Sequence, residues 1–485
     1  MKKLFLIVAI LFTALPCSAA DCTWNGLTAT LDSTPTAAEL NACIGVAETK
    51  TGDVIINIPN STVTFSGSIS VDMSSGWANV DSLTIQGENE CTTTSNSNPS
   101  FDYPTSCGTD ITNFVVSYYG KDGKDFRVSN MEIEGTSGAI IQGDGKSWRF
   151  DHILWTNVTG PSSNRIIWIQ KGDAGEITDG LIDHCYFNGW AWGTIVHVQS
   201  TLDGGNAEWM TGAQLGTSHA VYLENNKIYS AIVGNYVTDN NGASRWVIRY
   251  NYIENAYIGG HDAQVNGFRG SLSTEFYNNV MVGGGQCFII YRSGAVGVAY
   301  NNTATGISCG TPYAFAIYRT DGGGGWGGSV CSNSSGKSYL ATTSTYPQSC
   351  SSGTGCIDID GDSSSPDGYP CRDQPGVSGN DPQIGGGQPW LFWNNTVNGS
   401  DAGSYIGVSS YGGSYVNSGT DWCSATSTMP STCNGVSTTY SAYTYPHPLS
   451  DEAVAVPANA IQGMQISNLG VTKNLIAWHR TDGLR

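Results

Sequence analysis

Charged residues are scarce in this sequence, and basic residues are the scarcest of them. Only 13% of the 485 residues are Asp, Glu, Lys or Arg, about half of the usual share. With 21 Lys and Arg against 40 Asp and Glu, the formal net charge is −19 at pH 7. Such a surface repels phosphate backbones, so we expect no nucleic-acid partner. It suits Ca²⁺, which proteins bind through oxygen ligands.

Long hydrophobic runs are missing after the first twenty residues. Two lysines precede an apolar run at residues 4–15, and small residues at 18–20 form a cleavage site. The run is too short to span a bilayer, which needs about 20 residues. We therefore expect residues 1–20 to be a signal peptide. The mature protein is then secreted, either extracellular or periplasmic, with no membrane span.

Cysteine spacings typical of zinc sites are also absent. The 14 cysteines include no Cys-x-x-Cys pair, and in an exported protein most cysteines form disulfides. Short separations favour three pairs: Cys22–Cys43, Cys91–Cys107 and Cys423–Cys433. The pairing of five cysteines between 309 and 371 stays open. Cys185 and Cys287 lie in apolar, strand-like runs and are expected to be buried free thiols.

What the sequence does contain is a recurring strand-like unit. Five of the eight spacings between successive copies lie between 22 and 32 residues, about one turn, or rung, of a parallel β-coil. Alternating apolar residues with Gly, Asn and Asp between them favour strands over helices. The copies are residues 83–85, 131–133, 153–155, 185–187, 226–228, 251–253, 279–281, 302–304 and 395–397.

An asparagine begins each of the last five copies, at 226, 251, 279, 302 and 395. Asn tolerates the left-handed backbone of a tight bend. Its amide can also bond to the copy on the next rung, about 4.8 Å away. We therefore predict a stacked asparagine column, against the alternative of scattered asparagines in unrelated turns.

The ends of the repeat region have a different character. Residues 37–49 are predicted to form a capping helix, with Leu40, Ile44 and Ala47 on one face, and residues 52–59 the first strand. Residues 310–388 are predicted to be a disulfide-stapled insertion rich in Cys, Gly and Ser. We expect one domain over residues 21–449, and a C-terminal extension or cap over 450–485.

Several segments resemble a known fold family. The run GDVIINIPNSTVTFSG, followed by LTIQG and by rungs such as LIDHCYF, resembles the right-handed parallel β-helix of the pectate-lyase-like superfamily. The segments RWVIRYNYIEN, FRGSLSTEFYNNV, GYPCRDQPG and YTYPHPL resemble a group of uncharacterised secreted β-helix repeat proteins. The resemblance covers about residues 37–449. It implies an all-β, single-stranded right-handed parallel β-helix, a scaffold that serves enzymes, adhesins and fibres alike.

One column of charged residues is the first candidate site. Asp151, Asp183 and Glu224 lie two residues before successive repeat positions, and Arg249 follows on the next rung. Stacked in register, three carboxylates would repel, so a bound Ca²⁺ or a neighbouring arginine should offset them. The alternative is structural: such side chains often satisfy local backbone donors, and the bend can turn them inward.

The family resemblance suggests a chemistry for this column. LIDHC is similar to the Trp-Ile-Asp-His-Cys strand of pectate lyases, with Asp183 and His184 at matching places and Leu181 in place of Trp. It implies Ca²⁺-assisted β-elimination on a uronan, with Arg249 as a catalytic candidate. The Arg-x-Pro-x-x-Arg pattern of those lyases is absent, which leaves the catalytic base without a match.

Further candidates lie outside that column. His261 is a candidate base, and Arg269 could hold a uronate carboxylate; the alternative is an Arg269–Glu275 pair that braces a turn. Arg245 could join either set. Trp190, Trp192 and Trp326 lie near glycines and are candidate plates for sugar rings, although most tryptophans only pack.

The sequence therefore predicts a secreted protein that acts on, or binds, a polysaccharide or cell-surface glycan. A uronan lyase is the leading hypothesis. A non-catalytic adhesin and a structural surface or filament protein are the alternatives. The protein is either a monomer or a self-associating coil.

Overall fold

The structure of the protein is a computed structural model. It describes residues 22–161, 165–171, 179–190, 193–200, 213–232, 235–240, 242–259, 271–283, 289–291, 296–306, 313–315, 389–408 and 417–450. The predicted signal peptide, residues 451–485 and the predicted insertion, except for 313–315, lie outside the described residues. So do Cys287 and the five cysteines between 309 and 371.

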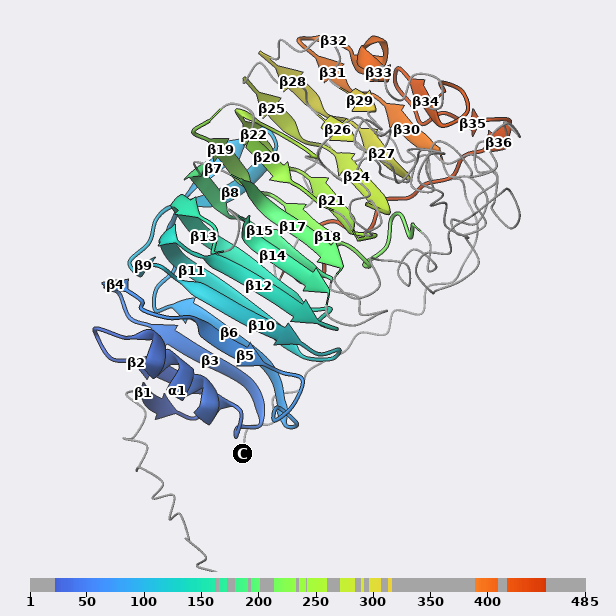
Figure 1. Cartoon of the computed structure of the whole chain (residues 1–485). Coiled ribbons are helices and arrows are strands. Elements are labelled where there is room, and N and C mark those ends of the chain that lie inside the picture. Colours follow the sequence, from blue (N-terminus) through green and yellow to red (C-terminus); the bar gives the residue numbers. More distant parts are fainter. Residues whose placement is uncertain are drawn as a thin grey trace, which may run out of the picture.

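The described chain is mostly β-strand, as predicted, and its strands stack in three parallel rows (Figure 1). The chain visits the first, second and third rows in turn and then returns to the first. Each strand pairs with its counterpart in the next repeat, as β15, β18 and β21 do in the first row. Rows one and two belong to one large sheet, and the third row forms sheets of its own.

The strands of each row have the following bounds. The first row contains β2 (Thr28–Leu31), β3 (Gly52–Ile58), β6 (Val80–Gly87), the starts of β11 (Asp125–Thr136) and β13 (Trp148–Thr159), β15 (Gly180–Asp183), β18 (Val221–Glu224), β21 (Arg245–Arg249), β24 (Ser273–Tyr277), β27 (Val296–Tyr300), β30 (Trp390–Trp393) and β34 (Trp422–Ala425). The second contains β4 (Thr62–Thr64), β9 (Asp110–Thr112), the ends of β11 and β13, β16 (Tyr186–Trp190), β19 (Lys227–Ser230), β22 (Tyr252–Glu254), β25 (Val280–Val282), β28 (Thr303–Thr305) and β31 (Thr396–Val397). The third contains β5 (Ile69–Asp72), β10 (Val115–Gly120), β12 (Gly138–Gly143), β14 (Arg165–Lys171), β17 (Thr194–Ser200), β20 (Asn235–Thr238), β23 (Ala256–Tyr257), and in a separate sheet β26 (Ile289–Tyr291), β29 (Tyr313–Phe315) and β33 (Ile406–Val408).

The predicted capping helix is present as α1 (Ala37–Ala47). Thr36 caps it, and Glu39 reaches back to the Thr36 backbone N–H, which forms a capping box. The helix buries Leu40 and Ile44 against the core. The expectation that residues 52–59 form the first strand was wrong, because the hairpin of β1 (Cys22–Asn25) and β2 precedes it, and β2 pairs with β3.

The repeat was aligned correctly except for its first copy. Residues 83–85 lie in the first row and pair with 126–128 of β11, whereas the later copies lie in the second row. The second-row neighbour of Ile133 is Ile111 of β9, which was not predicted as a repeat position. Ile111 is a single buried apolar residue between Asp110 and Thr112, too little signal to be seen without its neighbours.

The predicted asparagine column is present and continuous. The side-chain Nδ2 of Asn226 donates to Oδ1 of Asn251, and the same bond repeats through Asn279, Asn302 and Asn395, at 2.9–3.1 Å. The reason given for it needs a correction. The left-handed backbone belongs to the residue before each ladder member, such as Asn278 (φ 57°) before Asn279. The ladder asparagines themselves bond inward to main-chain carbonyls.

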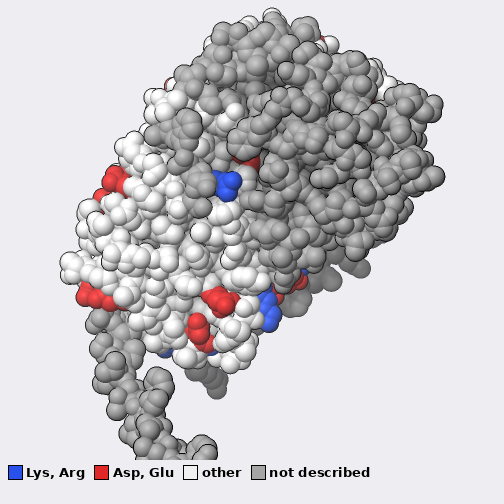
Figure 2. Space-filling model, in the orientation of Figure 1, with Lys and Arg blue, Asp and Glu red and all other residues white. Residues whose placement is uncertain are grey.

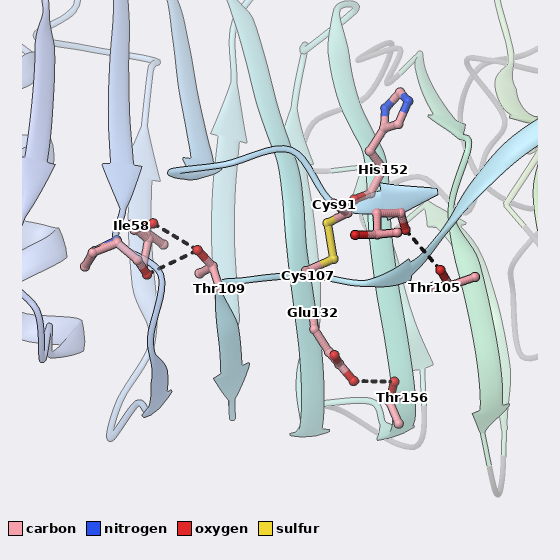
Figure 3. The surroundings of a disulfide bond; sticks show 10 residues. Ile58, Cys91, Thr105, Cys107, Thr109, Glu132, His152 and Thr156 are labelled. Carbon is pink, nitrogen blue, oxygen red and sulfur yellow. Dashed lines mark hydrogen bonds between the residues drawn. A yellow bond between two sulfur atoms is a disulfide. The ribbon is translucent and has the colours of Figure 1, made fainter. Parts of the chain in front are cut away.

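The three predicted disulfides, Cys22–Cys43, Cys91–Cys107 and Cys423–Cys433, are confirmed, and Cys185 is confirmed as a buried free thiol. The second disulfide closes the base of a hairpin formed by β7 (Thr92–Ser97) and β8 (Ser100–Ser106). Figure 3 shows it beside the carbonyl oxygen of His152, which lies 3.5 Å from Sγ of Cys91. No helix in the described chain is long and apolar enough to cross a membrane.

Replacing one ladder asparagine should destabilise the protein strongly. Asn279 is 1% exposed and its amide bonds to Asn302 and to two main-chain carbonyls. In Asn279→Ala those partners are left without their bonds in a dry core. We expect the free energy of unfolding to fall by about 2–4 kcal/mol in urea titrations, from roughly 1–3 kcal/mol per orphaned buried group.

Two variants serve as controls for that measurement. Asn25→Ala, at the exposed end of β1, should change the unfolding free energy by less than about 0.5 kcal/mol. Cys185→Asn places an amide where the Cys185 N–H already donates to Asn226, so it should extend the ladder at little cost. A loss in Asn279→Ala no larger than in Asn25→Ala would show that the ladder does not stabilise the fold.

Candidate functional site

The charged column that the sequence predicted is in register. Asp151 lies beside Asp183, Asp183 beside Glu224, and Glu224 beside Arg249, on β13, β15, β18 and β21. All four side chains point to the outer face of the first row, yet each residue is 0% exposed. The column therefore exists as predicted, but solvent does not reach it.

Arginines neutralise each of the three carboxylates. Asp151 accepts two bonds from Arg127, both at 2.7 Å, and Asp183 accepts two from Arg149, at 2.8 and 2.7 Å. Glu224 pairs with Arg249, whose Nε lies 2.6 Å from Oε2. The two-point contacts are the geometry that an Arg–carboxylate pair favours. The offset foreseen for this column is thus supplied by arginine.

Arg127 and Arg149 were not among the predicted site residues, although a signal for both was present. Each arginine sits two residues before the first-row position that aligns with Asp151, so side-chain alternation puts it on the same outer face. In Arg149-Phe150-Asp151 the spacing is visible in the sequence itself. That Arg149 pairs with Asp183 on the next rung could be known only from the stacked structure.

Two histidines complete the charged column. His152 and His184 follow Asp151 and Asp183, and both have left-handed backbones (φ 52° and 49°). Each is hydrogen-bonded through Nδ1 to its preceding aspartate, at 2.8 Å. Their rings stack with centroids 5.2 Å apart. Burial alone would raise the pKa of Asp183, but Arg149 and His184 hold that pKa below its usual range.

The C-terminal part of the described chain covers this column. We call residues 440–449 the strap; it runs back across the outer face of the first row, from the β24 and β27 end toward β13. The carbonyls of Tyr443 and Thr444 accept from Arg249 at 2.9 and 2.8 Å, and the His447 N–H donates to Glu224 at 3.1 Å. The Tyr445 ring stacks on Tyr250 with centroids 3.7 Å apart. We expected the coil to run to residue 449. In the described chain its last first-row strand is β34, and residues 440–449 form the strap.

These contacts can be compared with the roles predicted for the column, namely catalysis by Arg249 and Ca²⁺ binding by the three carboxylates. Arg249 is fully buried and gives its donors to Glu224, the Tyr277 hydroxyl and the strap, so it holds structure together where it lies. Asp151, Asp183 and Glu224 do not fit a Ca²⁺ site as they stand, because guanidinium groups occupy their oxygens. Among the described residues, no group of three or more His, Cys, Asp or Glu side chains is placed to hold a metal ion.

The remaining candidates separate into two groups. Trp190 is 1% exposed and packs in the main core, so it is not a solvent-facing plate, and Arg245 is buried at 4% exposure in β21. Glu275, which the alternative hypothesis paired with Arg269, accepts hydrogen bonds from the Tyr440 hydroxyl and the Gly216 N–H. His261, Arg269, Trp192 and Trp326 lie outside the described residues, and their predicted roles stay predictions.

A second arrangement of polar and aromatic side chains lies on the outer face of the third row, where no site residue was predicted. On β14, Trp168 and Gln170 alternate with the buried Ile167 and Ile169. The Trp168 ring is half-buried, and the Arg165 guanidinium lies 4.8 Å from its centroid. We call Trp168, Arg165, Gln142 and Gln170 the Trp168 face.

Amide side chains extend this face across the neighbouring rungs. Gln142 of β12 aligns with Gln170 and donates to it at 2.7 Å, and Tyr119 of β10 aligns with Gln142. The signal was available: Trp168 stands in the alternating run Ile-Ile-Trp-Ile-Gln, where period two sends Trp and Gln outward. Over the described part of the side drawn in Figure 2, acidic and basic side chains are few and scattered.

Comparison with known proteins adds little to this description. No family model and no curated protein matches the chain. Among solved structures, ORF18 of Geobacillus virus E2 is similar over 60% of this chain and 57% of its own length, with 11% identity and a TM-score of 0.30. The chain thus spans a little over half of that viral protein. A likeness of this size carries no argument about function.

Breaking the buried pair beneath the strap should cost more than breaking an exposed one. Arg249→Met leaves Glu224 buried with an uncompensated charge, so we expect the unfolding free energy to fall by about 3–5 kcal/mol. Lys146→Met removes an exposed pair with Asp122 and should cost less than about 1 kcal/mol. Equal losses in urea titrations would contradict the role assigned to Arg249.

The strap should also loosen in acid through His447. Burial, together with Arg249, lowers the pKa of His447 from 6.5 to about 4, and its Nδ1 accepts from the Leu449 N–H at 3.1 Å. Between pH 6.5 and about 4 the unfolded chain therefore binds a proton that the native protein does not, so stability falls as pH falls. The loss at pH 4 should be about 3 kcal/mol, at 1.36 kcal/mol per pKa unit.

The matched variant for this test is His447→Asn, whose side-chain oxygen can accept the same bond from Leu449 without titrating. Unfolding free energies measured at pH 7 and pH 4.5 should differ less in this variant than in the parent protein. An equal pH dependence in the two proteins would rule out His447 as its source.

Proposed function

We propose that the protein is a secreted polysaccharide-binding protein that holds glycan chains along the Trp168 face. The observation that carries the proposal is the half-buried Trp168 ring on an outer sheet face, with Arg165 at 4.8 Å and the paired amides of Gln142 and Gln170 beside it. A flat apolar ring stacks on a sugar ring. Amide groups donate to and accept from sugar hydroxyls.

The geometry of the face suits a chain-like ligand. Tyr119, Gln142 and Gln170 occupy aligned positions on three successive rungs, so side chains with a polar group recur about every 4.8 Å along the stack. A polymer with a repeating polar edge can meet several of them at once, and several weak contacts then act together. Extended polysaccharides have this repeating character.

The same proposal includes the architecture and the location. We infer that the three parallel rows form one right-handed coil of the pectate-lyase-like type, because the chain passes through the rows in constant order. Three disulfides fit an oxidising compartment, which supports the secreted location inferred from residues 1–20.

Binding without catalysis is the version that the geometry favours. The uronan-lyase hypothesis relies on Asp151, Asp183, Glu224 and Arg249, which are paired with one another or with other arginines, and on His261 and Arg269, which lie outside the described residues. The lyase hypothesis keeps a direct test: absorbance near 235 nm with Ca²⁺ and uronan polymers, since β-elimination produces an unsaturated sugar that absorbs there.

The binding proposal is tested by retention in affinity gels that contain single polysaccharides, uronans and neutral glucans among them. We expect retention by at least one polymer. In Trp168→Ala the apparent affinity should be at least tenfold weaker, because removing the ring removes apolar area that the sugar would bury, worth more than about 1.4 kcal/mol. Arg165→Ala should weaken retention as well.

Trp24→Ala is the matched control. Trp24 of β1 is likewise half-buried and has Lys50 at 4.2 Å from its ring, but it lies at the N-terminal cap. It should leave retention unchanged. If the folded protein is retained by no polymer, or if Trp168→Ala is retained as strongly as the parent, the Trp168 face is not a glycan-binding surface.

A further inference from the structure

A cleft of about 730 Å³ lies on the first-row side of the molecule, away from the Trp168 face. Its floor contains Val298 of β27 and Leu391 of β30, whose side chains point outward from the sheet. One wall is the chain segment 436–441, which leads into the strap, and the other is 214–216, just before β18. The volume is within the range of sites that hold small ligands.

The chemistry of the lining is specific. None of the described lining residues carries a formal charge, in a chain with a net charge of −19. The floor is apolar, and the walls present hydroxyl, amide and main-chain groups. The lining residues are Gln214, Leu215, Gly216, Val298, Pro389, Leu391, Cys433, Val436, Ser437, Thr438, Thr439, Tyr440 and Ser441.

One buried carboxylate connects the two walls. Glu275 of β24 is 3% exposed, and its Oε1 accepts from the Gly216 N–H at 2.6 Å while its Oε2 accepts from the Tyr440 hydroxyl at 2.5 Å. Burial raises the pKa of Glu275. Burying a carboxylate is costly unless it is well bonded, so these two bonds set the distance between the walls firmly.

The backbone where the two walls approach each other is also constrained. Gly216 has φ +71°, and a Cβ there would lie 1.9 Å from the Ser441 carbonyl oxygen. Only glycine allows this close approach. The cleft therefore has a fixed width, an apolar floor and a hydroxyl-rich wall.

We propose that this cleft is a second binding site, and that its ligand is a neutral oligosaccharide. The apolar face of a sugar ring lies against Leu215 and Val436, which are more exposed than the floor residues, and its hydroxyl groups bond to the wall at Ser437 and Thr439. Ionised sugars are disfavoured because the lining residues that the structure describes hold no charge to compensate them. Glu275 acts as a positioning residue, since it meets the walls rather than the ligand. The site is independent of the Trp168 face.

Isothermal titration calorimetry with three probes tests this proposal: cellohexaose and N-acetylchitohexaose, which are neutral, and hexagalacturonate, which is anionic. We expect saturable binding of at least one neutral probe. Thr439→Trp, which fills the cleft from its exposed wall, should weaken that binding at least tenfold. Thr94→Trp, an equally bulky change on exposed β7, should alter it less than twofold.

Two further variants separate this site from the rest of the protein. Glu275→Ala should weaken binding at least fivefold, and Glu275→Gln, which can still bond to both walls, should restore most of it. Trp168→Ala should leave the binding of the neutral probe unchanged, so failure of the Trp168 face and failure of the cleft are distinguishable.

Three results would overturn the proposal. The first is absence of binding by both neutral probes to folded protein at millimolar concentration. The second is binding that Thr439→Trp leaves intact. The third is tighter binding of hexagalacturonate than of either neutral probe, with Thr439→Trp abolishing it, since the ligand would then be anionic.

Discussion

The main-chain hydrogen bonds between rungs are the constraint on which everything else depends. Each strand is hydrogen-bonded to the strand one repeat away. Aligned residues in a row therefore point to the same side of the sheet, outward or inward. The asparagine ladder adds side-chain hydrogen bonds between the same successive rungs. Because register is kept, charged, aromatic and amide side chains line up in columns over rungs that are far apart in sequence.

This constraint also explains how much the sequence could predict. The repeat spacing was enough for the parallel strands and for the alignment of Asp151, Asp183, Glu224 and Arg249. The helix, predicted over 37–49 and present over 37–47, followed from apolar residues three and four positions apart. The three disulfides joined cysteines at most 21 residues apart. Local pattern therefore sufficed for the architecture and for the column.

What the sequence could not supply was the covering of that column. The contacts of Arg249 with Tyr443 and Thr444 join residues 194 and 195 positions apart, and no periodicity links them. The segment YTYPHPL has no strand alternation and was noticed only through a resemblance. The charged column is thus paired internally and buried, and the new candidate surfaces lie on faces for which the sequence had predicted no site.

The strap has a consequence for the order in which the chain assembles. Synthesis begins at the N-terminus, so each rung can stack on the one already made, with short-range closure at every step. The strap, however, contacts β18 and β21 only after about 200 further residues exist. Until then, the buried arginines and carboxylates of the first row stand open to water, and the protein is complete only when its last described segment docks.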